Sequence, residues 1–240
     1  MPSKAVRFLS RFAGEIYGGF PECSQYLDKK AKVFFTGNPI RREVGNISKE
    51  QGIKEFGLES GKKTILVFGG SQGAHSINLA VLDSLTHLDQ AGHLKDIQII
   101  FQTGQKDLGL VTEKRQNSKA SIKVLAYIDK MPQAMAAADL VISRSGAGVS
   151  ETLACGLPSI LIPYPHAASN HQEYNARSLE KAGAAEMILD SALNGRDLSQ
   201  KIIGILFNSE KYDKMAQAAG YLARPGAALE IAGKIFKLSE

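Results

Sequence analysis

A chain of 240 residues, 44% of them hydrophobic, is long enough to bury a sizeable core, and its length allows one or two domains. Its formal net charge is +5, but lysine and arginine are spread along the sequence without an aromatic-flanked basic cluster. This distribution argues against a nucleic-acid partner and leaves attraction to an anionic membrane surface open. No apolar run approaches the ~18 residues of a membrane span and no CxxC pair occurs, so we expect neither an integral membrane protein nor a disulfide-built domain.

The first 38 residues do not share the pattern of the rest of the chain. They predict a helix, a strand over 15–20, a second helix and a strand over 32–36, and we expect them to be the end of another domain whose beginning is absent. Residues 37–41 then predict a stiff link, because Pro39 fixes its own φ and restricts the residue before it.

The first helix carries four apolar side chains that can share one face: Val6, Phe8, Leu9 and Phe12. This pattern favours packing against a core over the alternative, contact with a membrane surface. Charged residues interrupt the stretch and no small-residue cleavage site follows, which argues against a signal peptide.

From residue 63 onward, apolar β-rich runs alternate with helical patterns, which predicts an α/β fold with a Rossmann-like, doubly wound parallel sheet. The predicted strands cover 64–68, 97–101, 122–127, 140–143, 159–163 and 186–189. The predicted helices cover 74–88, 105–117, 132–138, 149–154 and 171–182. The tail over 197–240 is predicted to be helical with a break near Pro225, because proline cannot continue a helix.

One glycine-broken turn, residues 143–151, joins a predicted strand to a predicted helix and has the sequence SRSGAGVSE. The backbone N–H groups at such a helix start suit a diphosphate, and the Glu151 carboxylate can accept hydrogen bonds from two ribose hydroxyls. The alternative is that Ser150 and Glu151 only favour the helix N-terminus. Sugar nucleotides carry both a diphosphate and a ribose.

A second glycine-rich loop, GGSQGA over 69–74, also joins a strand to a helix. It suits close backbone approach to a phosphate, with the Ser71 hydroxyl beside Gln72, although a tight turn without a ligand is the alternative. The loop departs from the GxGxxG spacing, and no acidic residue follows the next strand at Gln102-Thr103-Gly104, which argues against NAD or FAD.

Three further residues are candidates for ligand contacts. A uracil ring could lie against Ile128, Gln172 can both donate to and accept from sugar hydroxyls, and Arg41 could pair with a phosphate. The alternatives are a core isoleucine and a solvated arginine in a link. His166 and His171 have no evident third ligand and no HExxH pattern, so we expect no metal site.

The GxSxG pattern of serine hydrolases does occur, as GGSQG over 69–73, within the glycine-rich loop already assigned to phosphate approach. No GxxxxGK[ST] motif is present, which argues against a Walker A kinase.

The ordered set of motifs resembles the MurG family of bacterial peptidoglycan N-acetylglucosaminyltransferases. The motifs are GNPIR, GGSQGA, QTG, YIDKM, SRSGAGVSE, CGLPSILIPYPH, NHQEYNA and LEKAGAA. The resemblance implies the C-terminal, donor-binding half of a GT-B fold and UDP-N-acetylglucosamine as donor, with no cofactor. It further implies inverting transfer to lipid-linked N-acetylmuramoyl-pentapeptide by a peripheral enzyme at the cytoplasmic face of the inner membrane.

Carried onto this sequence, the resemblance implies a set of substrate-binding residues. Arg41 and Ser71, with Gln72 in the same loop, would contact phosphate, and Ile128 would contact uracil. The turn Ala147, Gly148, Val149, Ser150 and Glu151 would hold the diphosphate, sugar and ribose, and Gln172 would contact N-acetylglucosamine. The implied division of the chain is 1–38 as a remnant of the acceptor domain and link, 39–221 as the donor domain and 222–240 as a returning C-terminal helix.

The chain also departs from the family pattern. The family's first domain, with its GGTGGH loop and candidate base, is missing, so no catalytic residue is assigned and the chain alone is expected to be inactive. Val6 takes the place of a family asparagine, and the 145–151 loop is one residue shorter. Two alternatives therefore remain: the donor-binding subunit of a split two-chain transferase, and a non-catalytic nucleotide-sugar binding module.

Overall fold

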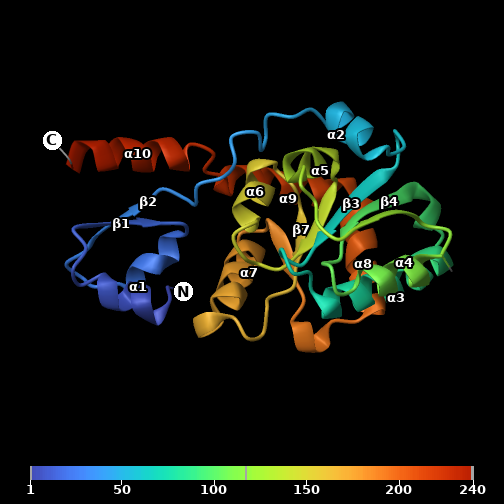
Figure 1. Cartoon of the computed structure of the whole chain (residues 1–240), viewed down its shortest axis with the longest axis horizontal. Coiled ribbons are helices and arrows are strands. Elements are labelled where there is room, and N and C mark those ends of the chain that lie inside the picture. The colour runs from blue at the N-terminus through green and yellow to red at the C-terminus, as the bar shows by residue number, and fades with distance from the viewer. Residues whose placement is uncertain (1, 117, 239–240) are drawn as a thin grey trace.

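The computed structural model describes residues 2–116 and 118–238 and contains two parallel sheets. Six strands form the larger sheet, with helices on both of its faces, and two strands form a smaller sheet near the N-terminus (Figure 1). Residues 1, 117, 239 and 240 lie outside the described part of the chain. They include the last residue of the helix predicted over 105–117 and the last two residues of the tail predicted over 197–240.

The small unit contains α1 (Lys4–Leu9), β1 (Glu15–Gly18), the 3-10 helix η1 (Pro21–Tyr26) and β2 (Lys32–Phe35). β1 and β2 pair in parallel, and the Tyr17 and Phe34 rings stack with centroids 6.0 Å apart. The C-terminal helix α10 (Ala227–Leu238) lies beside this unit, with Lys234 Nζ 3.7 Å from the centre of the Phe34 ring (Figure 1).

The predicted burial of the apolar face of the first helix was wrong for the described residues. Val6 is 43% exposed, Phe8 and Leu9 are each 58% exposed, and Phe12 is 74% exposed and follows the end of α1. The side chains do share a side of the chain, since the Phe8 and Phe12 rings meet edge-on at 5.5 Å. Their helical spacing is therefore amphipathic, but no core of the described residues covers it.

All six strands of the large sheet run parallel, as predicted. In chain order they are β3 (Lys63–Phe68), β4 (Ile97–Gln102), β5 (Ser121–Leu125), β6 (Leu140–Ser143), β7 (Ser159–Leu161) and β8 (Ala185–Met187). Their order in the sheet is β5-β4-β3-β6-β7-β8, so the direction of winding reverses between β3 and β6. Two neighbouring loops consequently leave the carboxyl ends of β3 and β6 in opposite directions and open a crevice between them.

The helices follow the strands in doubly wound fashion. They are α2 (Lys49–Phe56), α3 (His75–Gln90), α4 (Leu108–Arg115), α5 (Met131–Ala137), α6 (Val149–Ala154), α7 (His171–Lys181), α8 (Gly195–Leu206) and α9 (Ser209–Leu222). Short 3-10 turns occur at η2 (Leu94–Asp96), η3 (Ala168–Asn170) and η4 (Asp190–Ala192). Within the described residues, no helix is long and apolar enough to cross a membrane.

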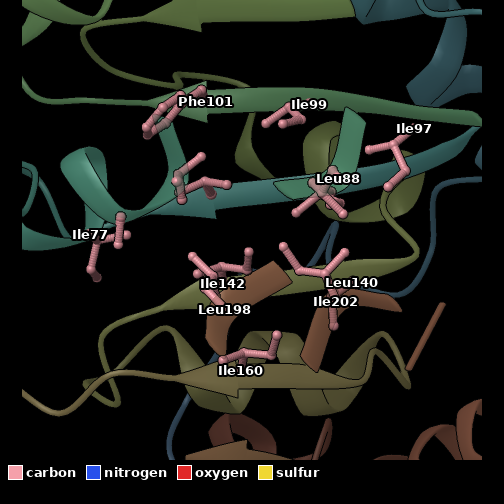
Figure 2. Close-up of a cluster of buried hydrophobic side chains, with 14 of the residues drawn as sticks. Ile77, Leu88, Ile97, Ile99, Phe101, Leu140, Ile142, Ile160, Leu198 and Ile202 are labelled. Carbon is pink, nitrogen blue, oxygen red and sulfur yellow. The ribbon is translucent and has the colours of Figure 1, made fainter. Parts of the chain in front are cut away.

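Successive residues of the strands alternate between two hydrophobic cores, one on each face of the sheet. Ile65, Ile99 and Ile142 belong to the core that α3 and α8 cover. Figure 2 shows Leu198 of α8 beside Ile142, and Ile202 of α8 beside Leu140. Leu66, Ile100 and Val141, which lie next to those strand isoleucines in the sequence, belong to the opposite core, which α5 covers. Burial on both faces explains why these strands are almost continuously apolar.

The helix α2 was missed from the sequence, although its signals are present. Ser48 caps it, Gln51 completes a capping box, and Gly57 ends it at φ 61°. The predicted break in the tail is confirmed between α9 and α10, while a second break at Phe207 and Asn208 was not predicted.

Candidate functional site

A cleft of about 720 Å³ lies at the point where the winding of the sheet reverses. It is lined by the loop after β3, the loop after β6, the 164–166 segment and the first turn of α7. Of the predicted site residues it brings together Gln72, Ala147, Gly148 and Gln172. The two glycine-rich turns identified in the sequence therefore face the same space.

Close backbone contact holds the loop after β3 against the loop after β4. Gly73 has φ 76°, and a Cβ there would lie 1.9 Å from the Thr103 carbonyl oxygen. Gly104 has φ 77°, and a Cβ there would lie 2.1 Å from the Gln72 carbonyl oxygen. Only glycine fits such an approach, so both glycines are explained by packing as well as by backbone conformation.

The loop after β3 leads directly into α3, a helix of 16 residues. The first turn of any α-helix has N–H groups without an intrahelical acceptor, and no described side chain caps this one at Ala74. Ser71 and Gln72 are exposed in the loop before it. Exposed N–H groups and the positive end of the helix dipole make this segment suitable for an anion.

The loop after β6 is braced from α7. The Ser145 hydroxyl donates to the Gln172 carbonyl oxygen at 2.7 Å, and Asn175 Nδ2 donates to the Ser145 carbonyl oxygen at 3.1 Å. Gly148 lies against Phe68, where an added Cβ would be 3.1 Å from the ring. The loop is therefore held in place by side chains before any ligand arrives.

Gln172 lines the cleft, but part of its hydrogen-bonding capacity is already used. Its Oε1 accepts from the Tyr164 N–H at 3.0 Å, and its Nε2 would be 3.7 Å from a Cβ built on Gly146. The side-chain amide thus has a fixed orientation with its donor end beside the glycine turn, which suits a hydroxyl acceptor.

Arg144 organises the cleft and was not among the predicted site residues. Its side chain is 12% exposed and pairs with Asp190, while Nη2 donates to Ser76 Oγ at 3.0 Å. Nη1 also donates to the carbonyl oxygens of Ile162 and Pro163 at 3.2 and 3.1 Å. The sequence signal was an arginine directly after a buried strand, but its partners lie as far as 68 residues away.

The predicted ribose and phosphate residues pair with each other. Arg41 donates to Glu151 through Nε at 2.7 Å and through Nη2 at 2.6 Å. The hydrogen bonds that Arg41 donates to the Glu151 carboxylate are the main cause that raises the pKa of Arg41. Neither side chain is among the described residues that line the cleft.

Ile128 is 2% exposed, and its backbone N–H donates to Gln102 Oε1 at 2.9 Å. The other end of the Gln102 amide, Nε2, donates to the Gly70 carbonyl oxygen at 2.9 Å. Gln102 therefore connects the glycine-rich loop to the segment that carries Ile128. Sequence reasoning placed Gln102 in a loop but did not identify this role.

Two of the remaining predicted residues, Val149 and Ser150, lie at the start of α6, and Ser71 lies in the loop after β3. The Val149 side chain is 2% exposed and belongs to the core beneath α6 and α7, so only its backbone can face a ligand. Ser150 Oγ accepts from Asn38 Nδ2 at 3.0 Å. Ser71 is exposed beside the cleft without belonging to its lining.

The two histidines considered as metal ligands have different surroundings. His166 belongs to the cleft lining, whereas His171 Nδ1 lies 2.9 Å from the Ala168 carbonyl oxygen. Over residues 2–116 and 118–238, no group of three or more His, Cys, Asp or Glu side chains is arranged to hold a metal ion.

Comparison with known proteins places this site in a family. Residues 64–231, which include the cleft and nearly all of the large sheet, match the glycosyltransferase family 28 C-terminal domain. The chain belongs to this family. Family 28 membership agrees with the predicted fold and with the predicted resemblance.

Relatives with curated names are similar over almost the whole chain. A protein of Desulfitobacterium hafniense (strain Y51) is 46% identical over 233 residues, which cover 95% of this chain and 62% of the relative. A protein of Halothermothrix orenii is 42% identical, with coverages of 94% and 62%. Both are named UDP-N-acetylglucosamine--N-acetylmuramyl-(pentapeptide) pyrophosphoryl-undecaprenol N-acetylglucosamine transferase. This family 28 chain thus spans about 62% of the length of these relatives.

Solved structures support the same fold. MurG of Acinetobacter baumannii superposes with a TM-score of 0.76 at 27% identity, over 96% of this chain and 62% of that protein. A UDP-GlcNAc 2-epimerase from Neisseria meningitidis, solved with UDP-GlcNAc bound, has a TM-score of 0.68 at 15% identity, over 96% of this chain and 63% of that protein. The second similarity shows the shared architecture of the sheet and its helices alone.

Proposed function

We propose that this family 28 chain binds UDP-N-acetylglucosamine in the cleft between the loops after β3 and β6. The complete enzyme to which it contributes would transfer N-acetylglucosamine, with inversion, to lipid-linked N-acetylmuramoyl-pentapeptide. The names of the relatives that are 42% and 46% identical give the transfer of N-acetylglucosamine and its acceptor, while inversion is implied by the family resemblance. The observation that carries the proposal is the cleft itself, where two glycine-rich turns converge at the reversal of a parallel sheet.

The proposed diphosphate site combines the N-terminus of α3 with the turn over 146–148. Both supply backbone N–H groups, and the glycines allow a ligand to approach the backbone closely. When the bond to the sugar breaks, negative charge grows on the departing UDP. Fixed N–H dipoles aimed at that charge stabilise the transition state more than the ground state.

The proposed sugar site lies beside Gln172. Its orientation is set by the Tyr164 N–H, which leaves the Nε2 end to donate to a sugar hydroxyl beside Gly146. Arg144 holds neighbouring parts of the cleft lining together, because it donates hydrogen bonds to Ser76 and Asp190. Positions fixed in this way reduce the rotational entropy lost on binding.

The chain spans about 62% of the length of its relatives, and we assign the catalytic base and most of the acceptor site to the part of their length that it does not span. Residues 1–38 would belong to that acceptor unit, 39–221 to the donor unit and 222–240 to a returning helix, a division that the contact of Lys234 with Phe34 supports. We place the enzyme at the cytoplasmic membrane face, where a net charge of +5 favours anionic lipid.

The proposal is tested by calorimetric titration of the purified chain with UDP-N-acetylglucosamine, UDP, UDP-glucose and ADP-ribose. We expect saturable binding of UDP-N-acetylglucosamine, weaker binding of UDP-glucose and none of ADP-ribose. Replacing Gln172 with alanine should weaken UDP-N-acetylglucosamine about tenfold, since it removes a hydrogen bond to the sugar, and should change the affinity for UDP much less.

The matched control is Gln217→Ala, which removes an exposed glutamine on α9 and should leave all affinities unchanged. Equal binding of ADP-ribose and UDP-N-acetylglucosamine, or no binding of either, would contradict the proposal. If binding is selective but an acceptor domain added in trans restores no turnover, the chain is a non-catalytic binding module.

A further inference from the structure

Arg41 and Glu151 form a bidentate ion pair in which one arginine engages both oxygens of one carboxylate. Arg41 Nε lies 2.7 Å from Oε1 and Nη2 lies 2.6 Å from Oε2, while the backbone N of Arg41 lies 3.5 Å from Oε1. The Glu151 side chain is 14% exposed and the Arg41 side chain is 43% exposed. The carboxylate is therefore largely withdrawn from water and held by a planar fork that matches its geometry.

This pair fixes the start of α6 to the link that follows β2. Arg41 and Glu151 are 110 residues apart in the sequence, and the neighbouring pair Asn38 and Ser150 joins the same two segments through a 3.0 Å hydrogen bond. Two adjacent attachments prevent the carboxylate from rotating freely about its side-chain bonds. Glu151 thus has a defined direction before any ligand binds.

Arg41 is not among the described residues that line the cleft in which we propose that the diphosphate binds. That lining includes Gly70, Gly73 and Gly148. The charged or ionisable groups that act on Arg41 are Glu151, Tyr127 and Glu43. Tyr127 directly precedes Ile128, so the arginine lies toward the proposed base and ribose side of the site.

The carboxylate keeps acceptor capacity in spite of the pair. Its two oxygens offer about four lone-pair positions. Arg41 uses two positions on Oε1 at most and one on Oε2, so at least one position on Oε2 remains among the described contacts. A ribose hydroxyl can donate to that oxygen without displacing the arginine.

We propose that Arg41 is a positioning residue, which holds the Glu151 carboxylate for a ribose hydroxyl and so makes the site selective for ribonucleotides over deoxyribonucleotides. This assignment rests on the proposed binding of a uridine diphosphate sugar. It differs from the phosphate contact that the family resemblance implies for Arg41. The arginine acts on the nucleotide through Glu151 and makes no contact with the phosphates.

The test compares three ligands by calorimetry: uridine diphosphate, 2′,3′-dideoxyuridine diphosphate and uridine. The ratio of the first two affinities measures the hydroxyl contribution, and the ratio of the first and third measures the diphosphate contribution. The proteins are the unmodified chain, Arg41→Ala, Arg41→Lys and Glu151→Gln. Arg42→Ala is the matched control, because it removes an exposed arginine from the same link.

In the unmodified chain and in Arg42→Ala, loss of the hydroxyls should weaken binding about tenfold. Arg41→Ala and Glu151→Gln should both reduce that loss of affinity to about twofold. Arg41→Lys should give an intermediate value, because an ammonium cannot donate to both carboxylate oxygens in the planar geometry of a guanidinium. The ratio of the affinity for uridine diphosphate to the affinity for uridine should stay the same in every protein. Uridine binding also shows that each variant is folded.

An Arg41→Ala protein that keeps the tenfold hydroxyl factor but loses the preference for uridine diphosphate over uridine would overturn the assignment and make Arg41 a phosphate ligand. Absence of uridine diphosphate binding by the unmodified chain would overturn the proposed function and this assignment together. The two failures are therefore distinguishable.

Discussion

At the scale of single residues, the most constrained positions of the site are the two glycines that bring neighbouring loops into backbone contact. Gly73 and Gly104 both have positive φ, and each faces a carbonyl group of the other's loop. Any side chain there must push apart two loops that line or support the cleft. These glycines therefore determine the shape of the proposed diphosphate site.

We predict that Gly73→Ala lowers the free energy of unfolding by at least about 2 kcal/mol, since it combines a left-handed backbone with a Cβ 1.9 Å from the Thr103 oxygen. Gly92→Ala is the control, because Gly92 has φ 79° but no described atom within 4 Å of its Cβ. It should cost about 1 kcal/mol from backbone strain alone. Urea unfolding measures both, and equal losses would contradict the packing argument.

The sequence predicted which residues gather at the site better than it predicted their partners. Of the ten predicted substrate-binding residues, Gln72, Ala147, Gly148 and Gln172 line the cleft and the other six do not. The pairing of Arg41 with Glu151, and of Gln102 with the Ile128 N–H, was not predicted. Local signals report helix starts and turns, whereas these contacts join segments that only the folded sheet brings together.

At the scale of elements, one carboxylate ties the edge strand β8 to two helices of the tail. Glu186 accepts from Lys201 on α8 at 2.5 Å and from Lys211 on α9. Burial works to raise the pKa of the Glu186 carboxyl, but the hydrogen bonds and charges of Lys201 and Lys211 outweigh burial and hold the pKa below its ordinary value. The ionised form therefore stabilises the folded chain.

Because the folded pKa of Glu186 lies below the unfolded value of ~4.3, its stabilisation is present above that pH and is lost as the pH falls through the folded pKa. We predict that Glu186→Gln lowers the free energy of unfolding at pH 7 by about 1–2 kcal/mol. The difference from the unmodified chain should shrink as the pH is lowered below ~4.3.

The control for this prediction is Glu210→Gln, since Glu210 and Lys214 form an exposed pair on α9. It should change stability by less than about 0.5 kcal/mol. A Glu186→Gln difference that is the same at pH 7 and pH 3 would show that the charge of Glu186 is not what stabilises this edge.

The predicted bounds of helices and strands were most accurate where glycine, proline or polar capping residues flank the element. The predicted strand over 140–143 and helix over 149–154 have the bounds of β6 and α6. β7 ends at Leu161 rather than at 163, where proline cannot donate to a neighbouring strand. The apolar run continues past the end of β7, because Ile162 is buried and its N–H still donates to the Ser143 carbonyl oxygen of β6.

At the scale of the whole molecule, the order of the strands creates the site. Alternation of strand and helix patterns predicted a parallel sheet, but not that β3 and β6 lie side by side. The exposed face of Phe8, Leu9 and Phe12 shows the same limit. Periodicity identifies an amphipathic face, and only the surroundings decide what covers it.

The central claim is that a uridine diphosphate sugar occupies the cleft where the winding reverses, and amide chemical shifts during titration with UDP-N-acetylglucosamine test it most directly. We predict that the largest saturable shifts fall on residues 69–76 and 144–151. A second cavity of about 650 Å³ reaches the start of α6 at Ser150, and the rest of its lining includes Gly19, Phe35 and Tyr221. Shifts concentrated there, or no saturable shifts at all, would contradict the account.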